Sequence, residues 1–160
     1  MVNVADVLAE RRAGILEESI EAVQGVHVRH YEHAGEAFTR ERLADLFDLV
    51  VTAVHDRQLA PVSAYCEQVA QQRFEAGFGI SEVQSAFNAL ERAMWDCVVS
   101  EVPAADLAEA VGLLSTVFGF GKDALARRYV SLASDRHVPT LDLSALFGGT
   151  EGAQVADLAR

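Results

Sequence analysis

The sequence predicts an all-α domain, built as a bundle of about five to six helices. Apolar residues recur at spacings of three and four along most of the chain, which is the period of a helix with one buried face. Glycine and proline fall between these stretches, where helices end and begin. Of the 160 residues 51% are hydrophobic, so the chain has enough apolar side chains to fill one core.

The first part of the chain predicts a long helix, a short segment and a second long helix. Residues 4–24 carry apolar side chains at helical spacing, and Gly25 is expected to end that helix. A short helical segment is expected over 26–35. Thr39 is a good N-cap for the next helix. Its stripe is the most regular of the chain and consists of Leu43, Leu46, Phe47, Val50, Val51 and Val54.

A helix–turn–helix corner follows, and the rest of the chain is expected to pack around it. Pro61 fits the first turn of a helix over 61–78, and a further helix is expected over 81–102. Gly77 can take the positive φ that a helix C-cap needs. Ser81 and Gln84 have the spacing of a capping box, in which each side chain satisfies a backbone N–H of the new helix.

Arg73 lies in the last turn before that corner. One interpretation is that its charge compensates the negative end of the helix and caps its carbonyls. The sharper interpretation is that it holds the corner together by pairing with an acid such as Glu82. We expect a structural role in either case.

The last helix, expected over 104–136, contains more glycine than a helix interior tolerates without a reason. Gly112, Gly119 and Gly121 each cost about 1 kcal/mol relative to alanine. Either the helix breaks near Gly121, or small residues allow another helix to approach. Gly112, Ser115 and Gly119 lie on one face, which we expect to pair with the same helix of a second chain.

Pro139 is expected to end the regular structure. The chain therefore divides into a helical domain over 1–138 and a C-terminal tail over 139–160 with a short amphipathic segment. No signal peptide is visible at the N-terminus.

Composition argues against several classes of partner. The formal net charge is −11, and Lys122 is the only lysine. Nucleic acids and anionic membranes bind clustered basic residues, which this sequence lacks. No uninterrupted apolar run approaches the roughly 18 residues of a membrane span. We therefore expect a cytoplasmic protein without nucleic-acid or membrane partners.

The titratable residues suggest little chemistry. His27, His30 and His33 recur every three residues, and His30 and His33 are weak candidates for a metal site. His55 suits the negative end of its helix rather than catalysis. Cys66 and Cys97 lie on apolar helix faces, where free cysteine behaves as a small hydrophobe. We expect no catalytic residues, no cofactor and no enzyme activity.

Aromatic residues are common in the second half of the chain. Most are expected to lie in the core, and a minority interpretation is that some line a cavity for an apolar ligand. The set consists of Phe74, Phe78, Phe87, Trp95, Phe118, Phe120 and Tyr129.

Two stretches carry a family resemblance. Residues 72–95 read QRFEAGFGISEVQSAFNALERAMW, and residues 38–54 read FTRERLADLFDLVVTAV. Over roughly residues 5–137 the chain resembles the N-terminal sensor domain of the RsbR family of stressosome proteins. Its motif is diffuse: an arginine-ended helix, a glycine turn, and a helix that opens with Ser-Glu-Val.

The resemblance implies a globin-like, non-haem fold that dimerises and relays a signal to an output domain. In the family that output is a STAS domain, which engages a partner-switching kinase. The sequence given stops at Arg160, which leaves no room for one, so we expect a stand-alone sensor or a piece of a longer protein. The helices over 81–102 and 104–132 contain no histidine to bind haem iron.

We therefore expect a regulatory sensor and protein-interaction module of bacterial stress signalling, acting as a homodimer and with another regulatory protein. The alternative is a carrier that binds a small ligand in the aromatic core or a metal at His27, His30 and His33.

Overall fold

The computed structural model describes residues 1–26 and 29–137. This part of the chain is all-α, with seven helices and no strand. The helices are α1 (Val4–Glu10), α2 (Arg12–Gly25), α3 (Arg29–Ala34), α4 (Glu36–Asp56), α5 (Ala60–Glu75), α6 (Ile80–Glu101) and α7 (Ala104–His137).

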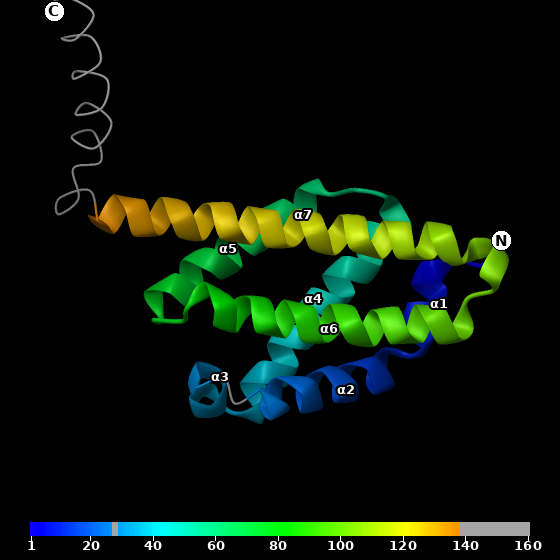
Figure 1. Ribbon diagram of the computed structural model, residues 1–160, viewed down its shortest axis with the longest axis horizontal. Coiled ribbons are helices and arrows are strands. Elements are labelled where there is room, and N and C mark those ends of the chain that lie inside the picture. The colour runs from blue at the N-terminus through cyan, green and yellow to red at the C-terminus, as the bar shows by residue number, and fades with distance from the viewer. Residues whose placement is uncertain (27–28, 138–160) are drawn as a thin grey trace, which may run out of the picture.

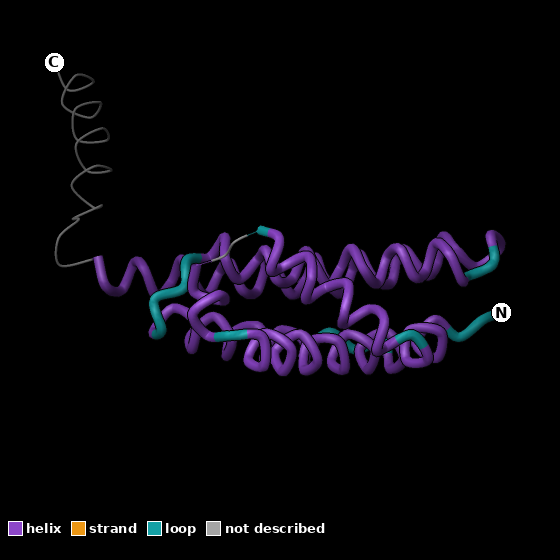
Figure 2. Tube along the Cα trace, turned by 90° about the horizontal axis from the view of Figure 1, so that it is seen from below, coloured by secondary structure: helices purple, strands orange, loops and turns teal. Residues whose placement is uncertain are grey.

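The helices form an elongated bundle whose long axis follows α6 and α7 (Figure 1). The most extensive contacts join α5 to α7 and α2 to α6, and α6 also packs on α7. Helix α4 crosses the bundle and contacts each of the other helices. Turned by 90°, the same bundle is seen as two layers (Figure 2). The C-terminal end of α7 extends past the other helices (Figure 1).

The core is built from the predicted apolar stripes. Each fully buried leucine or phenylalanine contributes roughly 1.5–3 kcal/mol by its removal from water. The largest fully buried side chains come from α1, α4, α6 and α7: Phe47, Phe118, Leu8, Leu90, Met94, Leu114 and Leu125. The predicted all-α fold is confirmed.

The first predicted helix is divided in two. Arg11 (φ −98°, ψ 7°) interrupts it between α1 and α2. The expectation of one continuous helix over 4–24 is therefore wrong. Helix α1 packs on α4 and α6, whereas α2 makes its largest contact with α6. The apolar spacing continues through the interruption, so periodicity alone does not reveal it.

The start of α4 also differs from the expectation. The helix begins at Glu36, and its N-cap is Gly35 at φ +89°. Thr39 is buried inside the first turn, where its hydroxyl donates to the carbonyl oxygen of Gly35 at 3.1 Å. The assignment of Thr39 as N-cap is wrong because the positive φ of glycine begins the helix one turn earlier.

Helix α7 is unbroken, so a break near Gly121 does not occur. Gly121 is buried against α5: a Cβ there would lie 3.1 Å from Cys66 Sγ and 3.3 Å from Val62 Cγ1. Gly121 is thus the position at which α5 and α7 approach closely. Pro139 and the predicted tail over 139–160 lie outside the described residues.

One helix in the described part of the chain, over Ala104–Ser134, is long and apolar enough to cross a membrane by length and composition alone, since an 18-residue window within it has a mean hydropathy of 1.3. This criterion averages hydropathy over a window, whereas the expectation concerned uninterrupted apolar runs, which charged and small polar residues interrupt in this helix. Core helices can pass the same test, and α7 buries Leu114, Phe118 and Leu125.

Candidate functional site

The corner between α5 and α6 contains a left-handed turn. Helix α5 ends at Glu75 with Ala76 as C-cap, and Gly77 follows at φ +87°. The N–H of Phe78 donates to the carbonyl oxygen of Arg73 at 2.9 Å, which satisfies one of the last carbonyls of α5. Gly77 therefore has the conformation that the sequence predicts for it.

The cap of α6 differs from the predicted one. The helix begins at Ile80 with Gly79 as N-cap, and the Glu82 carboxylate accepts the Gly79 N–H at 2.7 Å. Ser81 is exposed inside the first turn, so the capping box of Ser81 with Gln84 is wrong. An ionised carboxylate in the first turn is favoured by the helix dipole, which explains why Glu82 fills this role.

Glu82 also connects α6 to α3. Its carboxylate lies 2.8 Å from His30 Nδ1 and accepts the His30 backbone N–H at 3.4 Å. Burial opposes ionisation of Glu82, but the hydrogen bonds from His30 and Gly79 outweigh it and lower the pKa of Glu82. The ring of His30 also packs against that of Phe78, with centroids 4.9 Å apart.

The histidine segment does not form a metal site in the part of the chain that is described. No group of three or more His, Cys, Asp and Glu side chains there is placed to hold a metal ion. His30 is instead paired with Glu82, and His33 is exposed. His27 lies outside the described residues.

Arg73 is buried, with only 6% of its surface exposed. The predicted pair with Glu82 is wrong: none of the ion pairs among the described residues includes Arg73. Its guanidinium carbon lies 4.7 Å from the centroid of the Phe38 ring and 5.5 Å from that of Phe78. Arg73 therefore packs between aromatic faces, which attract a cation.

The aromatic residues around Arg73 hold three helices and the corner together. Tyr31 of α3 and Phe78 meet edge to face at 5.1 Å, and the Tyr129 hydroxyl of α7 donates to the Phe78 carbonyl oxygen at 3.1 Å. The sequence reasoning missed Tyr31 and Phe38, because their own segments show no pattern that points toward the corner. The cavity beside this cluster measures about 20 Å³, too small for the apolar ligand considered from the sequence.

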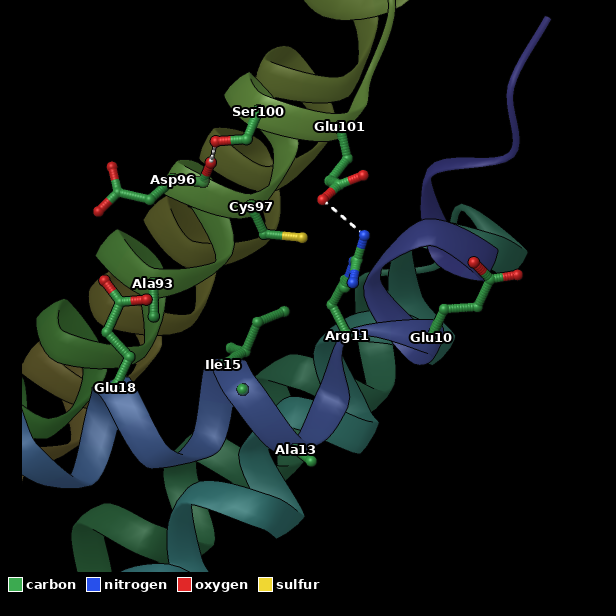
Figure 3. A pocket seen from close by; sticks show the side chains of 11 residues that line it. Glu10, Arg11, Ala13, Ile15, Glu18, Ala93, Asp96, Cys97, Ser100 and Glu101 are labelled. Atoms are coloured by element: carbon green, nitrogen blue, oxygen red, sulfur yellow. Dashed lines mark hydrogen bonds and ion pairs between the residues drawn. The ribbon is translucent and has the colours of Figure 1, made fainter.

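A shallow surface groove of about 420 Å³ lies along the contact between α2 and α6 (Figure 3). Arg11 and Glu101 pair across it at 2.8 Å, and the Cys97 side chain points into it (Figure 3). Burial raises the pKa of the Cys97 thiol, with a contribution from Glu101, so the thiol stays protonated at neutral pH. The groove therefore lacks an activated nucleophile.

The outer face of α7 is exposed along the small residues that the sequence singled out. Gly112, Ser115 and Gly119 are all exposed, and no atom lies within 4 Å of a Cβ built on either glycine. Phe120 and Val130 are 36% and 64% exposed on the same helix. These residues define the α7 outer face, which also carries the exposed ion pair of Arg127 with Asp123.

The described residues therefore form an all-α bundle that is closed at the α5–α6 corner and leaves the outer face of α7 exposed. The chain matches the family described as the RsbT co-antagonist protein rsbRD N-terminal domain over residues 6–138. It belongs to that family, whose domain is globin-like, so the resemblance seen in the sequence is confirmed. No curated protein and no solved structure matches the chain.

Membership places the chain among RsbT co-antagonist domains, which belong to stress signalling. The family is regulatory and is not known as catalytic. Its description also implies interaction with RsbT, a regulatory partner.

Proposed function

We propose that this protein is a cytoplasmic sensor and interaction module of partner-switching stress signalling, which acts as a homodimer without catalysis of its own. The observation that supports this most strongly is the family match over residues 6–138, which includes nearly the whole helical bundle. A module of this kind passes its signal on as a change in its binding to a partner protein. Its functional surface is therefore a protein–protein interface.

The α7 outer face supports the dimer. Its glycines allow two backbones to approach closely, which offsets the roughly 1 kcal/mol that each costs in a helix interior. A two-fold axis brings the same patch of both copies together, so the patch has to be complementary to itself. Gly112, Ser115 and Gly119 are small and uncharged, and the exposed Asp123 and Arg127 beyond them pair with each other.

The titratable groups support a non-catalytic role. His30 Nδ1 pairs with a carboxylate oxygen of Glu82 at 2.8 Å, and His55 Nδ1 pairs with a carboxylate oxygen of Asp56 at 2.8 Å. Burial raises the pKa of Cys66 to about 12, so its thiol is not a nucleophile at neutral pH.

Two measurements on the unmodified protein test the proposal. Light scattering at tens of micromolar should give twice the mass of one chain. Titration calorimetry with an RsbT protein should give a saturable signal, because a co-antagonist domain acts through that partner. A monomer at this concentration would refute the dimer, and the absence of any heat or mass change with RsbT would refute the direct interaction.

A further inference from the structure

A second feature of the Arg73 cluster goes beyond the proposed function and does not depend on it. Arg73 has a buried Nε atom without a hydrogen-bond partner, and the same is true of Arg42 Nε on α4. Both residues line the cavity of about 20 Å³ between α3, α4, α5 and α6. Two residues with such donors line one small space and require an explanation, because buried donors are normally satisfied.

The two arginines come from neighbouring helices, α4 and α5, and their guanidinium groups lie near one aromatic ring. Phe38 lies 4.7 Å from the guanidinium carbon of Arg73 and 5.5 Å from that of Arg42. Arg42 also reaches Asp45, whose oxygen lies 3.4 Å from Arg42 Nη1 on the exposed side of α4. No Asp or Glu of the described residues lines the cavity itself. The two charged side chains that line the cavity are therefore both arginines, and of the two only Arg42 has a carboxylate partner in the described part of the chain.

Two phenols and a threonine complete the polar lining: Tyr31, Tyr65 and Thr39. The Thr39 hydroxyl already donates to the Gly35 carbonyl. Burial raises the pKa of Tyr65 to about 12, with Asp45 adding to the effect, while Arg42 and Arg73 oppose it. Burial likewise raises the pKa of Tyr31. Both phenols keep their proton at neutral pH, so each can turn an O–H toward the cavity.

Charge and size together select the occupant. Burying a guanidinium without a counterion is unfavourable, and the aromatic faces replace only part of its hydration. A space slightly above the ~10–15 Å³ that one water needs is too small for a phosphate, a carboxylic acid or a nucleotide. We propose that the cavity between Arg73, Arg42, Tyr31 and Tyr65 is a binding site for one monatomic anion, chloride being the physiological choice.

This site would tie the stability of the corner to an inorganic ion. Arg73 comes from the end of α5, Arg42 from α4 and Tyr31 from α3, so an anion between them joins three helices. A ligand that binds only the folded state raises the melting temperature with its concentration, in a saturable way.

The first test uses the unmodified protein. The melting temperature is followed as chloride replaces gluconate at constant ionic strength, since gluconate is too large for the cavity. We expect a saturable rise. Crystals soaked in bromide should show an anomalous peak between Arg73 and Tyr65. Equal melting temperatures in both salts, or a bromide data set that shows only water there, would overturn the proposal.

A matched pair of variants separates the site from general salt effects. Tyr65→Phe removes one hydroxyl donor and keeps the ring, so it should weaken the chloride response about tenfold, as expected for one hydrogen bond to a charge. Tyr129→Phe makes the same chemical change outside the cavity lining and should keep the wild-type response. Equal chloride responses in both variants would contradict the assignment, and the bromide experiment does not depend on either variant folding.

Discussion

At the scale of single residues, Glu82 makes two contacts that stabilise the α5–α6 corner. Its carboxylate accepts the N–H of Gly79, which caps α6, and it pairs with His30 of α3. One side chain thus satisfies a helix start and links the short helix α3 to α6. Because both contacts favour the ionised form, the stability of the corner depends on pH.

Glu82→Gln should lower the free energy of unfolding by about 1 kcal/mol at pH 7, through loss of a charge-assisted hydrogen bond and of the favourable dipole interaction. The pKa of Glu82 is lowered in the folded state. Its contribution is therefore present above the ordinary value of 4.5 and is lost as the pH falls through the lowered folded value.

Urea denaturation at several pH values checks this. The difference in the free energy of unfolding between wild type and Glu82→Gln should become smaller as the pH falls below about 4. Glu41→Gln, an exposed change on α4, serves as the control and should show no such difference. A difference that stays constant down to pH 3 would contradict the assigned role of the charge.

Gly77 is the second residue on which the corner depends. At φ +87° a Cβ is strained, so Gly77→Ala should destabilise the protein by about 1 kcal/mol or more. Gly14→Ala in the first turn of α2 is the matched control, because no atom lies within 4 Å of its Cβ position. There alanine should stabilise the helix by up to about 1 kcal/mol. Thermal denaturation gives the melting temperature of both variants. Equal shifts of the melting temperature in the same direction would contradict backbone strain at position 77.

At the scale of helices, the contact between α5 and α7 depends on Gly121. A Cβ there meets Cys66 and Val62 at 3.1 and 3.3 Å, closer than ordinary van der Waals contact. The two helices make the most extensive contact of the bundle. The absence of a side chain at Gly121 sets how closely they pack.

Gly121→Val should therefore cost roughly 1–3 kcal/mol by overpacking the α5–α7 contact. Gly14→Val, at an exposed helical position, should cost at most a few tenths of a kcal/mol relative to the glycine protein, since β-branching and glycine have comparable helix penalties. Chemical denaturation gives both values. If Gly121→Val is as stable as Gly14→Val, the helices can separate without cost and the close approach is not a determinant.

At the scale of the whole molecule, the exposed face of α7 is the surface through which we propose that the domain meets a second copy. Helix α7 presents its apolar ladder to α5 and α6 and leaves Gly112, Ser115 and Gly119 outside. Val99 of α6, 55% exposed, adds an apolar side chain to the surface of the neighbouring helix. This arrangement supports the proposed dimer.

Gly119→Arg should convert the dimer to a monomer, because a long charged side chain would be placed where two backbones approach. Gly14→Arg introduces the same residue at another exposed helical glycine and should leave the dimer intact. Light scattering at matched concentrations reports the mass of each. A Gly119→Arg protein that keeps the dimer mass while folded would place the interface elsewhere.

The helices and their buried faces could be read from the sequence. Periodicity depends only on which residues are apolar, so the stripe of α4 was predicted in place, and local turn chemistry predicted the glycine turn at Gly77. Helix starts were not, because Thr39 and Ser81 are suitable caps on local grounds. Gly35 and Gly79 fill those positions, the second with help from the Glu82 carboxylate.

The surroundings of Arg73 were decided by the tertiary structure alone. The sequence places an arginine at the end of α5, and its local pattern suggests an exposed charge near Glu82. Phe38 and Tyr31 lie more than thirty residues away in the chain, and no local spacing relates them to Arg73. Helical periods report which face a residue occupies within its own helix; only the packing of separate helices determines what that face meets.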